Sequence, residues 1–345
     1  MANAAAIQRG ANRVPVTVLT GFLGAGKTTI LNDILKQPGM DGAAVIINEF
    51  GEVGIDHMLV EKILGEAVLL ESGCLCCSLR GDLVDTMNVL RLQAEAGDIP
   101  RFDRLLIETT GLADPAPVLQ TLMAEPMLTP YYRLSALVSA VDAANGGDTL
   151  DTHPEAVKQA ALASLILLTK TDIAGTAETS RTEARLRAIN PQAPVERVTG
   201  GAIDAARFFA AADYDADAAG FDLDGIVAEE PHDHGGHHHH HAEDGVSTFC
   251  IARDRPLPWG ALSVWLDSLT SIRGADLLRV KGIVEVEGCD APVVIHGVQH
   301  VFHPPETLDA WPEGVRGSRI VCITRGLDAV AVSNALDAAV EKLRH

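Results

Sequence analysis

The sequence predicts an α/β protein with a mostly parallel, doubly wound sheet, followed by a smaller α+β domain. From residue 14 to about residue 198, short β-branched and aliphatic runs alternate with segments of helical periodicity, a pattern typical of βαβ units. Most of these runs are apolar throughout, as expected of parallel strands that are covered on both faces. The 345 residues are long enough for two domains.

The expected elements follow the chain in two groups. In the helix expected after the three cysteines of residues 74–77, Leu79, Leu83, Met87 and Leu90 recur at helical spacing. The strands expected in the first domain cover residues 14–20, 43–48, 66–70, 103–108, 134–142 and 163–169. In the second domain, strands are expected at 247–252, 276–288, 292–302 and 319–324, and helices at 257–269 and 327–343. The predicted parts are a flexible N-terminus (1–13), a first domain (14–220), a histidine-rich linker (221–245) and a C-terminal α+β domain (246–345).

Composition and charge narrow the classes of function. The formal net charge of −20 disfavours binding to phosphate backbones and to anionic lipid surfaces. The first residues lack the apolar run of a signal peptide, and no later stretch approaches the roughly 18 apolar residues of a membrane span. We therefore expect a cytoplasmic protein that binds neither nucleic acid nor membranes and keeps its thiols reduced.

A glycine-rich motif follows the first expected strand directly. Residues 21–29, GFLGAGKTT, fit the pattern GxxxxGK[ST], in which backbone N–H groups surround phosphate oxygens at the start of a helix. Lys27 is expected to act as a catalytic residue on the β- and γ-phosphates, and the Thr28 hydroxyl to bind Mg²⁺. The strand before the motif and the helix after it argue against a chance glycine-rich turn and identify a P-loop NTPase. The expected nucleotide-binding residues of this loop are Gly21, Gly24, Ala25, Gly26, Lys27, Thr28 and Thr29.

Two acidic motifs occur where a P-loop protein would need them. Residues 105–111, LLIETTG, resemble a Walker B strand that ends in the Glu108 carboxylate. Glu108 is expected near the Mg²⁺ shell as a second catalytic residue, and the Gly111 amide is expected to face the γ-phosphate; a surface acid at a strand end is the alternative for Glu108. Glu49 and Glu52 belong to NEFGE, which predicts either a switch loop or a plain polar turn.

A third motif concerns the base. The strand that ends at Thr169 continues into TKTD, which is similar to the guanine-recognition motif NKxD. There the aspartate, here Asp172, pairs with the N1–H and the exocyclic amine of guanine, whereas adenine presents the wrong edge. Lys170 and Asp172 therefore favour GTP as the bound nucleotide. Thr169 replaces the usual Asn, so ATP stays an alternative.

Three cysteines lie within four positions in ESGCLCCS: Cys74, Cys76 and Cys77. A disulfide is disfavoured in a reducing compartment, and the adjacent Cys76 and Cys77 could bridge only with strain. Two alternatives remain, namely inert buried thiols and a metal site. Thiolates suit Zn²⁺ or Cu(I), and added carboxylate or imidazole ligands would suit Zn²⁺ or Co²⁺.

In combination, these motifs resemble those of the CobW family, P-loop GTPases related to the nickel insertion factors of hydrogenase and urease maturation. The likeness rests on GFLGAGKTT, NEFGEVGID, ESGCLCCS, ETTGLADP and TKTD in this order, and a C-terminal β-rich domain extends it over most of the chain. The resemblance implies GTP hydrolysis coupled to the delivery of a transition metal, Zn²⁺ or Co²⁺, to a client metalloprotein. The metal ligands that it implies are Cys74, Cys76 and Cys77, with Glu49 or Glu52 as possible additions.

The expected linker contains a histidine tract, within EEPHDHGGHHHHHAED at residues 229–244. Imidazoles in a flexible acidic segment bind Zn²⁺, Ni²⁺ or Co²⁺, so we expect an auxiliary metal site, with a solubilising loop as the alternative. Its candidate ligands are His232, His234, His237, His238, His239, His240 and His241.

The histidines of the C-terminal domain are expected to be hydrogen-bonded or surface residues, with a second metal site as the alternative, and its cysteines are expected to lie in the core. Strand parity places His296 and His300 on one face of a strand and His303 on the other. Core positions are expected for the three cysteines in apolar strand patterns, Cys250, Cys289 and Cys322.

The sequence thus predicts a GTPase metallochaperone in which water attacks the γ-phosphate. Intrinsic turnover is expected to be slow, since no arginine finger or catalytic glutamine can be assigned, and metal, a homodimer or a partner would raise it. Two other functions stay open. One is a metal-storage protein that uses nucleotide as a structural ligand, and the other is a P-loop ATPase or kinase acting on a small molecule.

Overall fold

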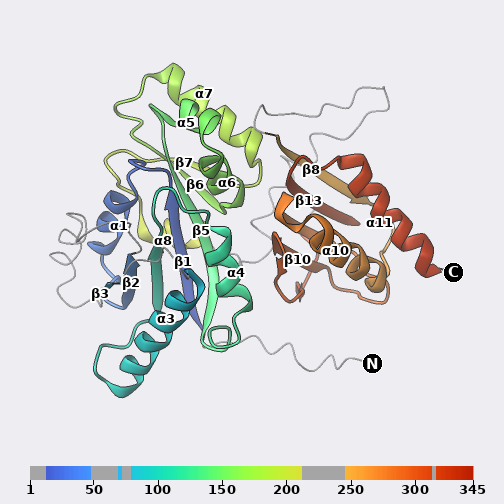
Figure 1. The fold of residues 1–345 in the computed structure, drawn as a ribbon, viewed down its shortest axis with the longest axis horizontal. Coiled ribbons are helices and arrows are strands. Elements are labelled where there is room, and N and C mark those ends of the chain that lie inside the picture. Colours follow the sequence, from blue (N-terminus) through green and yellow to red (C-terminus); the bar gives the residue numbers. More distant parts are fainter. Residues whose placement is uncertain (1–12, 48–68, 72–78, 212–244, 313–315, 345) are drawn as a thin grey trace. The chain divides into compact units, whose positions relative to one another are not determined.

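The computed structural model describes residues 13–47, 69–71, 79–211, 245–312 and 316–344 (Figure 1). The chain divides into two compact units, one formed mainly by Ala11–Arg187 with Ala193–Asp215, the other mainly by Ala216–His345 with Ala188–Gln192. The first unit contains a parallel sheet and the second an antiparallel sheet. The predicted α/β fold with a smaller α+β domain is therefore confirmed.

The parallel sheet has seven strands in the order β3-β2-β4-β1-β5-β6-β7. The strands are β1 (Val14–Gly21), β2 (Ala43–Ile47), β3 (Leu69–Glu71), β4 (Arg104–Glu108), β5 (Tyr132–Asp142), β6 (Leu165–Thr169) and β7 (Val195–Arg197). Strands β1, β2, β4, β5 and β6 are almost wholly buried, in line with their uninterrupted apolar runs. Strand β7 was not predicted, because its three residues, VER, form no apolar run.

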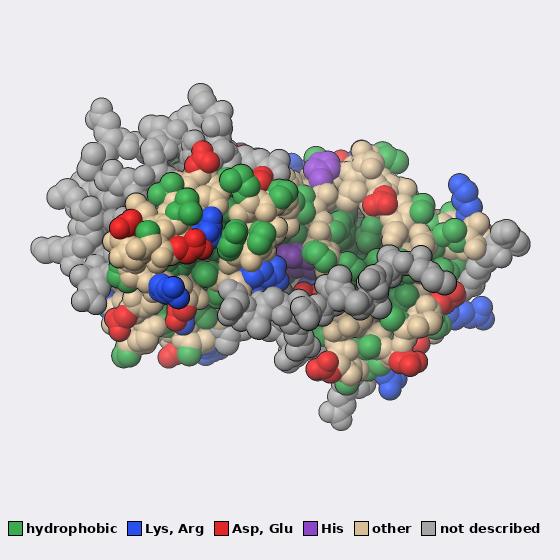
Figure 2. Space-filling model, turned by 90° about the horizontal axis from the view of Figure 1, so that it is seen from below, with side chains coloured by type: hydrophobic (Ala, Val, Ile, Leu, Met, Phe, Trp, Pro, Cys, Tyr) green, Lys and Arg blue, Asp and Glu red, His purple; other side chains and the backbone are tan. Residues whose placement is uncertain are grey.

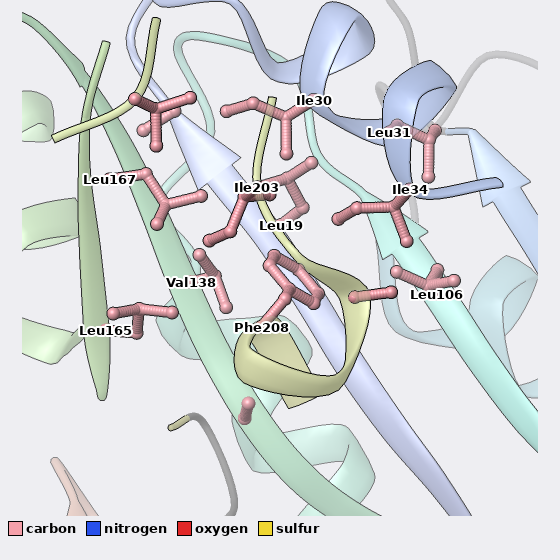
Figure 3. Close-up of a cluster of buried hydrophobic side chains, with 14 of the residues drawn as sticks. Leu19, Ile30, Leu31, Ile34, Leu106, Val138, Leu165, Leu167, Ile203 and Phe208 are labelled. Carbon is pink, nitrogen blue, oxygen red and sulfur yellow. The ribbon is translucent and has the colours of Figure 1, made fainter. Parts of the chain in front are cut away.

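Helices lie on both faces of this sheet. They are α1 (Lys27–Leu35), α3 (Leu79–Ala96), α4 (Ala116–Ala124), α5 (Gly146–Thr152), α6 (Pro154–Leu162), α7 (Thr176–Ile189) and α8 (Ala205–Ala211). The core beneath α1 and α8 is a hydrophobic cluster in which Ile30 and Ile34 meet Leu19 and Val138 of the sheet and Phe208 of α8 (Figure 3). This packing fixes the start of α1 against the end of β1.

Helix α3 confirms the predicted helical stripe in part. Leu83, Met87 and Leu90 are buried, and the Met87 carbonyl accepts a hydrogen bond of 2.8 Å from the Tyr132 hydroxyl on β5. Burial raises the pKa of Tyr132 to about 12, so this phenol stays a donor at neutral pH.

The second unit is an antiparallel sheet with two long helices. Its elements are β8 (Val246–Arg253), α10 (Trp259–Arg273), η2 (Gly274–Asp276), β9 (Leu277–Val284), β10 (Val293–Val298), β11 (Val301–Phe302), β12 (Glu306–Thr307), β13 (Ser318–Arg325) and α11 (Ala329–Arg344). The strand order is β11-β10-β9-β13-β8, with β12 paired to β10. The Trp265 indole of α10 is buried and donates to the Val332 carbonyl of α11 at 3.0 Å, which joins the two helices over the core.

The predicted face sharing of the three C-terminal histidines is wrong. Strand β10 ends at Val298, and Gln299 takes a left-handed φ of 52°, so the chain reverses before β11. As a result the rings of His296 and His303 stack with centroids 5.2 Å apart, while His300 Nδ1 lies 2.9 Å from the Thr270 carbonyl oxygen. Parity applies only along an uninterrupted strand.

The core prediction for the cysteines holds for Cys322 alone, because Cys250 and Cys289 are exposed. Cys322 lies in the cluster beneath the helices, and burial raises the pKa of its thiol. Cys250 is on β8 at the sheet edge and pairs in register with Val321, one position away from Cys322 and therefore on the opposite face. Cys289 follows β9 in a turn, with its N–H bonded to the Val286 carbonyl at 3.1 Å.

Among the described helices, none combines the length and the apolar character needed to cross a bilayer. On the face shown in Figure 2, acidic and basic side chains are interspersed with hydrophobic ones. The excess of acidic residues is therefore not gathered into one patch on that face.

Candidate nucleotide-binding site

The P-loop lies at the carboxyl end of β1, where two glycines permit its shape. Gly21 has φ 140°, and a Cβ there would lie 2.3 Å from the Ala140 carbonyl oxygen of β5. Gly26 has φ 92° and directly precedes α1, where its carbonyl accepts the first helical bond, from Ile30 N–H at 3.0 Å. The loop therefore ends at a helix N-terminus, which is the arrangement that binds phosphate.

Lys27 begins α1 and is folded back onto the loop. Its ammonium donates to the carbonyl oxygens of Gly21 at 2.9 Å and Phe22 at 3.3 Å, and the residue is only 8% exposed. The positive charge thus lies at the first residues of the P-loop, where it can bind the oxygens of a triphosphate.

Thr28 and Glu108 meet across 80 residues of sequence. The Thr28 hydroxyl donates to the Glu108 carboxylate at 2.8 Å, because Glu108 ends β4 opposite Leu19 of neighbouring β1. Glu108 is 6% exposed, so it is not the surface acid considered as its alternative. A hydroxyl and a carboxylate side by side are the hard oxygen donors that suit Mg²⁺.

The loop after β4 forms a tight turn against the P-loop. The Ala113 N–H bonds to the Thr110 carbonyl at 3.1 Å, and Gly111 packs so closely that a Cβ there would lie 2.6 Å from Leu23 N. Only glycine fits this contact, and it brings the Gly111 backbone beside the phosphate-binding loop.

Gln159 of α6 was missed from the sequence. Its side-chain N–H groups donate to the carbonyl oxygens of Gly111 at 3.1 Å and Ala113 at 3.0 Å. Gln159 is one polar residue in the buried alanine-rich run QAALA, and that polar exception was the available signal.

The TKTD element contacts the P-loop from β6. The Thr169 hydroxyl donates to the Ala25 carbonyl at 2.8 Å and lies 3.2 Å from the Val141 carbonyl. Thr169 therefore anchors the P-loop although it replaces the usual Asn. Asp172, which would pair with the base, is exposed.

Lys170 and Asp142 form an ion pair beside this anchor, with Nζ 2.8 Å from Oδ2. Burial alone would raise the pKa of Asp142, but the hydrogen bonds from Lys170 and Asn145 outweigh it and hold that pKa below its ordinary value. Lys170 has φ 57°, a left-handed conformation that turns the chain sharply after β6. Asp142 is another site residue that the sequence reading missed.

A cavity of about 280 Å³ opens beside the P-loop. P-loop residues 22–25, the end of β5 and helices α5 and α6 line it, and the lining includes Lys170, Asp142 and Gln159.

The residues expected to bind a transition metal lie outside the described part of the chain. They are Cys74, Cys76, Cys77, Glu49, Glu52 and the histidines His232, His234, His237, His238, His239, His240 and His241. Their metal-binding role stays a prediction. Within the described residues, no group of three or more His, Cys, Asp or Glu side chains is placed to hold a metal ion.

Known families and proteins match the chain along most of its length. The family described as CobW/HypB/UreG, nucleotide-binding domain, matches residues 15–197, and the cobalamin synthesis protein cobW C-terminal domain matches residues 246–340. The zinc chaperone YjiA of Escherichia coli (strain K12) is 36% identical over 292 residues, which cover 84% of this chain and 88% of that protein. The zinc chaperone CobW of Pseudomonas aeruginosa is 30% identical over 361 residues, covering 95% and 92%.

Solved structures give the same result. The crystal structure of the Zn(II)-bound YjiA GTPase from E. coli superposes with a TM-score of 0.73 at 29% identity, covering 95% of this chain and 99% of that chain. The family expected from the motifs is confirmed, because both family domains match the chain. The chain belongs to the CobW family of P-loop GTPases.

Proposed function

We propose that this protein is a GTP-hydrolysing metallochaperone that binds Zn²⁺ at its C-x-C-C segment and delivers it to a client protein. The observation that carries the GTPase part is the Thr28–Glu108 hydrogen bond of 2.8 Å at the P-loop, since it assembles oxygen ligands beside Lys27. The zinc part is supported by the relatives named zinc chaperones in E. coli and P. aeruginosa.

In this proposal the chain's own groups position the triphosphate for attack by water. Lys27 and the P-loop N–H groups bind the phosphate oxygens, and the Gly111 N–H faces the γ-phosphate. Thr28 and Glu108 would hold Mg²⁺, which when bound neutralises charge that develops on the phosphates. Asp172 would select guanine through its carboxylate.

The strand register supports a metal site close to the nucleotide. Ile47 of β2 pairs with Glu71 of β3 on one side and with Glu108 of β4 on the other, all in parallel. The segment with Glu49 and Glu52 and the segment with Cys74, Cys76 and Cys77 therefore leave the sheet from neighbouring strand ends, at the same edge as Glu108. Thiolates and carboxylates together suit Zn²⁺, with Co²⁺ as the other candidate ion.

Coupling between cargo and nucleotide follows from this placement. If loss of the γ-phosphate changes the segment after β2, the spacing between its carboxylates and the thiolates changes too. Zn²⁺ affinity would then differ between the GTP and GDP states, and by linkage Zn²⁺ would change nucleotide affinity by the same factor. A client protein or a second copy of the chain would trigger the release of Zn²⁺. In this proposal the cycle of GTP binding, hydrolysis and Zn²⁺ release takes place in the cytoplasm.

The deciding experiment is metal analysis of untagged protein loaded with a non-hydrolysable GTP analogue or with GDP. The analogue form is expected to hold tightly bound Zn²⁺, and Cys74/Cys76/Cys77→Ala to lose it. Cys250→Ser/Cys289→Ser is the matched control, because both thiols are exposed and lie in the C-terminal unit. Equal Zn²⁺ affinity in both nucleotide states, or tightly bound Zn²⁺ retained by the triple variant, would contradict the proposal.

A further inference from the structure

Two adjacent side chains of helix α6 bind the turn that follows β4, residues 110–114. Gln159 donates to the carbonyls of Gly111 and Ala113 at 3.1 and 3.0 Å, and Lys158 pairs with the Asp114 carboxylate at 2.6 Å. We infer that Gln159 is a positioning residue that holds Gly111 ready for the γ-phosphate and so favours the triphosphate over the diphosphate. This inference rests on the proposed GTPase function.

Within the described part of the chain, the side-chain hydrogen bonds of Gln159 are confined to this turn. The residue is 1% exposed, and the side-chain amide oxygen Oε1 of Gln159 has no hydrogen-bond partner among the described residues. Every described side-chain hydrogen bond of Gln159 therefore ends on the turn after β4. A buried amide that loses these contacts would be left unsatisfied, so the turn and the side chain stabilise each other.

The turn itself is held at both ends. Asp114 Oδ2 accepts from Lys158, and Asp114 Oδ1 accepts from the Ala116 N–H at 3.0 Å, at the start of α4. At its other end Gly111 lies against the backbone of Leu23, with no room for a Cβ. Among the described residues, Gln159 alone is hydrogen-bonded to the carbonyl oxygens of Gly111 and Ala113, so it sets how the Gly111 peptide faces the P-loop.

The direction of the effect follows from what each nucleotide offers. GDP lacks the phosphate that the Gly111 N–H is proposed to contact, so a looser turn does not weaken GDP binding. A triphosphate must order the turn if Gln159 does not, and that conformational entropy reduces its affinity. Loss of Gln159 therefore changes the ratio of the two affinities.

The test uses full-length, zinc-free protein in the presence of Mg²⁺ and equilibrium binding of GDP and of a non-hydrolysable GTP analogue. Gln159→Leu has similar volume and removes both hydrogen bonds, so affinity for the analogue is expected to fall about tenfold while GDP affinity is unchanged. Gln93→Leu on α3 makes the same exchange outside the turn and is expected to change neither affinity.

A second variant tests the same inference in case Gln159→Leu does not fold. Lys158→Met keeps most of the side-chain length, lies at a partly exposed position and removes only the ion pair with Asp114. It is expected to shift the affinity ratio in the same direction by a smaller factor, because Gln159 remains. Thermal unfolding of each variant checks that the fold is intact.

The outcomes separate this inference from the proposed function. Equal losses for both nucleotides, or no loss for the analogue in either variant, would overturn the role of Gln159 while leaving the GTPase proposal standing. Failure of the wild-type protein to bind the GTP analogue at all would overturn both. Because no transition metal and no hydrolysis enter the measurement, a failed delivery assay does not affect it.

Discussion

The Thr28 hydroxyl and the Glu108 carboxylate lie 2.8 Å apart, although 80 residues separate them in the chain. The contact exists because β1 and β4 are parallel neighbours, so that the residue ending β4 meets the first turn of α1. In a parallel sheet the functional groups gather at the carboxyl ends of the strands, and this pair is an instance of that rule.

Replacing Glu108 by Gln tests this pair. Gln keeps a carbonyl acceptor for Thr28 and the same shape, but it loses the negative charge that would favour Mg²⁺. The Mg²⁺ concentration that gives half-maximal GTP hydrolysis is expected to rise about 10–100-fold. Thr28→Ser, which retains the hydroxyl, serves as the control and is expected to behave nearly as wild type. An unchanged Mg²⁺ dependence in Glu108→Gln would refute the assignment.

Thr169 is predicted to stabilise the fold through its hydroxyl. Thr169→Val keeps the shape but leaves the Ala25 carbonyl without its 2.8 Å hydrogen bond, in a residue that is 3% exposed. The free energy of unfolding is expected to fall by about 1–3 kcal/mol in urea titrations, and GTP affinity to fall with it.

Thr169→Ser is the matched control, since it keeps the donor and loses only a methyl group. It should retain most of the stability and nucleotide affinity. If the Ser and Val variants were equally impaired, packing of the methyl group rather than the hydrogen bond would hold the P-loop.

The Asp142–Lys170 pair predicts a dependence of stability on acid pH. The pKa of Asp142 is lowered in the folded protein, so its stabilising contribution is present above the unfolded value of about 4 and is lost as pH falls through the folded pKa. The difference in unfolding free energy between wild type and Asp142→Asn should therefore be constant above about pH 5 and shrink below about pH 4.

Urea unfolding between pH 3 and pH 6 measures this difference. Asp148→Asn is the control, because the Asp148 carboxylate is 89% exposed and lies 3.7 Å from Arg181. It should show no comparable trend. If the difference in unfolding free energy between wild type and Asp142→Asn did not change with pH, the ion pair with Lys170 would not stabilise the folded protein.

Local patterns were sufficient for most of the sheet and for the phosphate loop. Buried parallel strands have continuous apolar runs, and the P-loop is a contiguous motif whose flanking strand and helix were equally visible. Strand β7 has neither feature and is a strand because its backbone pairs with β6. The contact from Thr169 to Ala25 spans 144 residues and that from Gln159 to Gly111 spans 48, so no local pattern encodes either.

The C-terminal histidines show the converse case. Parity was the correct rule for a strand, but Gln299 takes a left-handed conformation that no turn residue such as Gly or Asn announces. One such residue reverses the chain, and His303 then meets His296 instead of lying on the opposite face.

The histidine tract is predicted to be an auxiliary metal site. Deleting residues 232–241 should lower the number of Zn²⁺ ions bound per chain while leaving GTP turnover nearly unchanged, because these imidazoles are metal ligands and belong to none of the nucleotide-binding motifs. Inductively coupled plasma analysis and a phosphate-release assay measure the two quantities. Replacing the seven histidines by Asn controls for length, and a loss of turnover in both variants would indicate a structural role instead.

Lys27→Ala distinguishes a chaperone from a metal store. Lys27 donates to the carbonyls of Gly21 and Phe22 at 2.9 and 3.3 Å, and its charge is the one that the P-loop offers to the triphosphate. The variant should bind Zn²⁺ at the wild-type stoichiometry but fail to support growth under zinc limitation, because delivery requires the nucleotide cycle.

Lys36→Ala is the matched control, an exposed lysine just after the end of α1, and it should support growth like wild type. A storage protein needs only its metal ligands, so it would keep protecting cells when Lys27 is lost. Growth of the Lys27→Ala strain at the wild-type rate would therefore favour storage over delivery. Loss of growth together with loss of bound Zn²⁺ would show instead that nucleotide is needed to build the metal site.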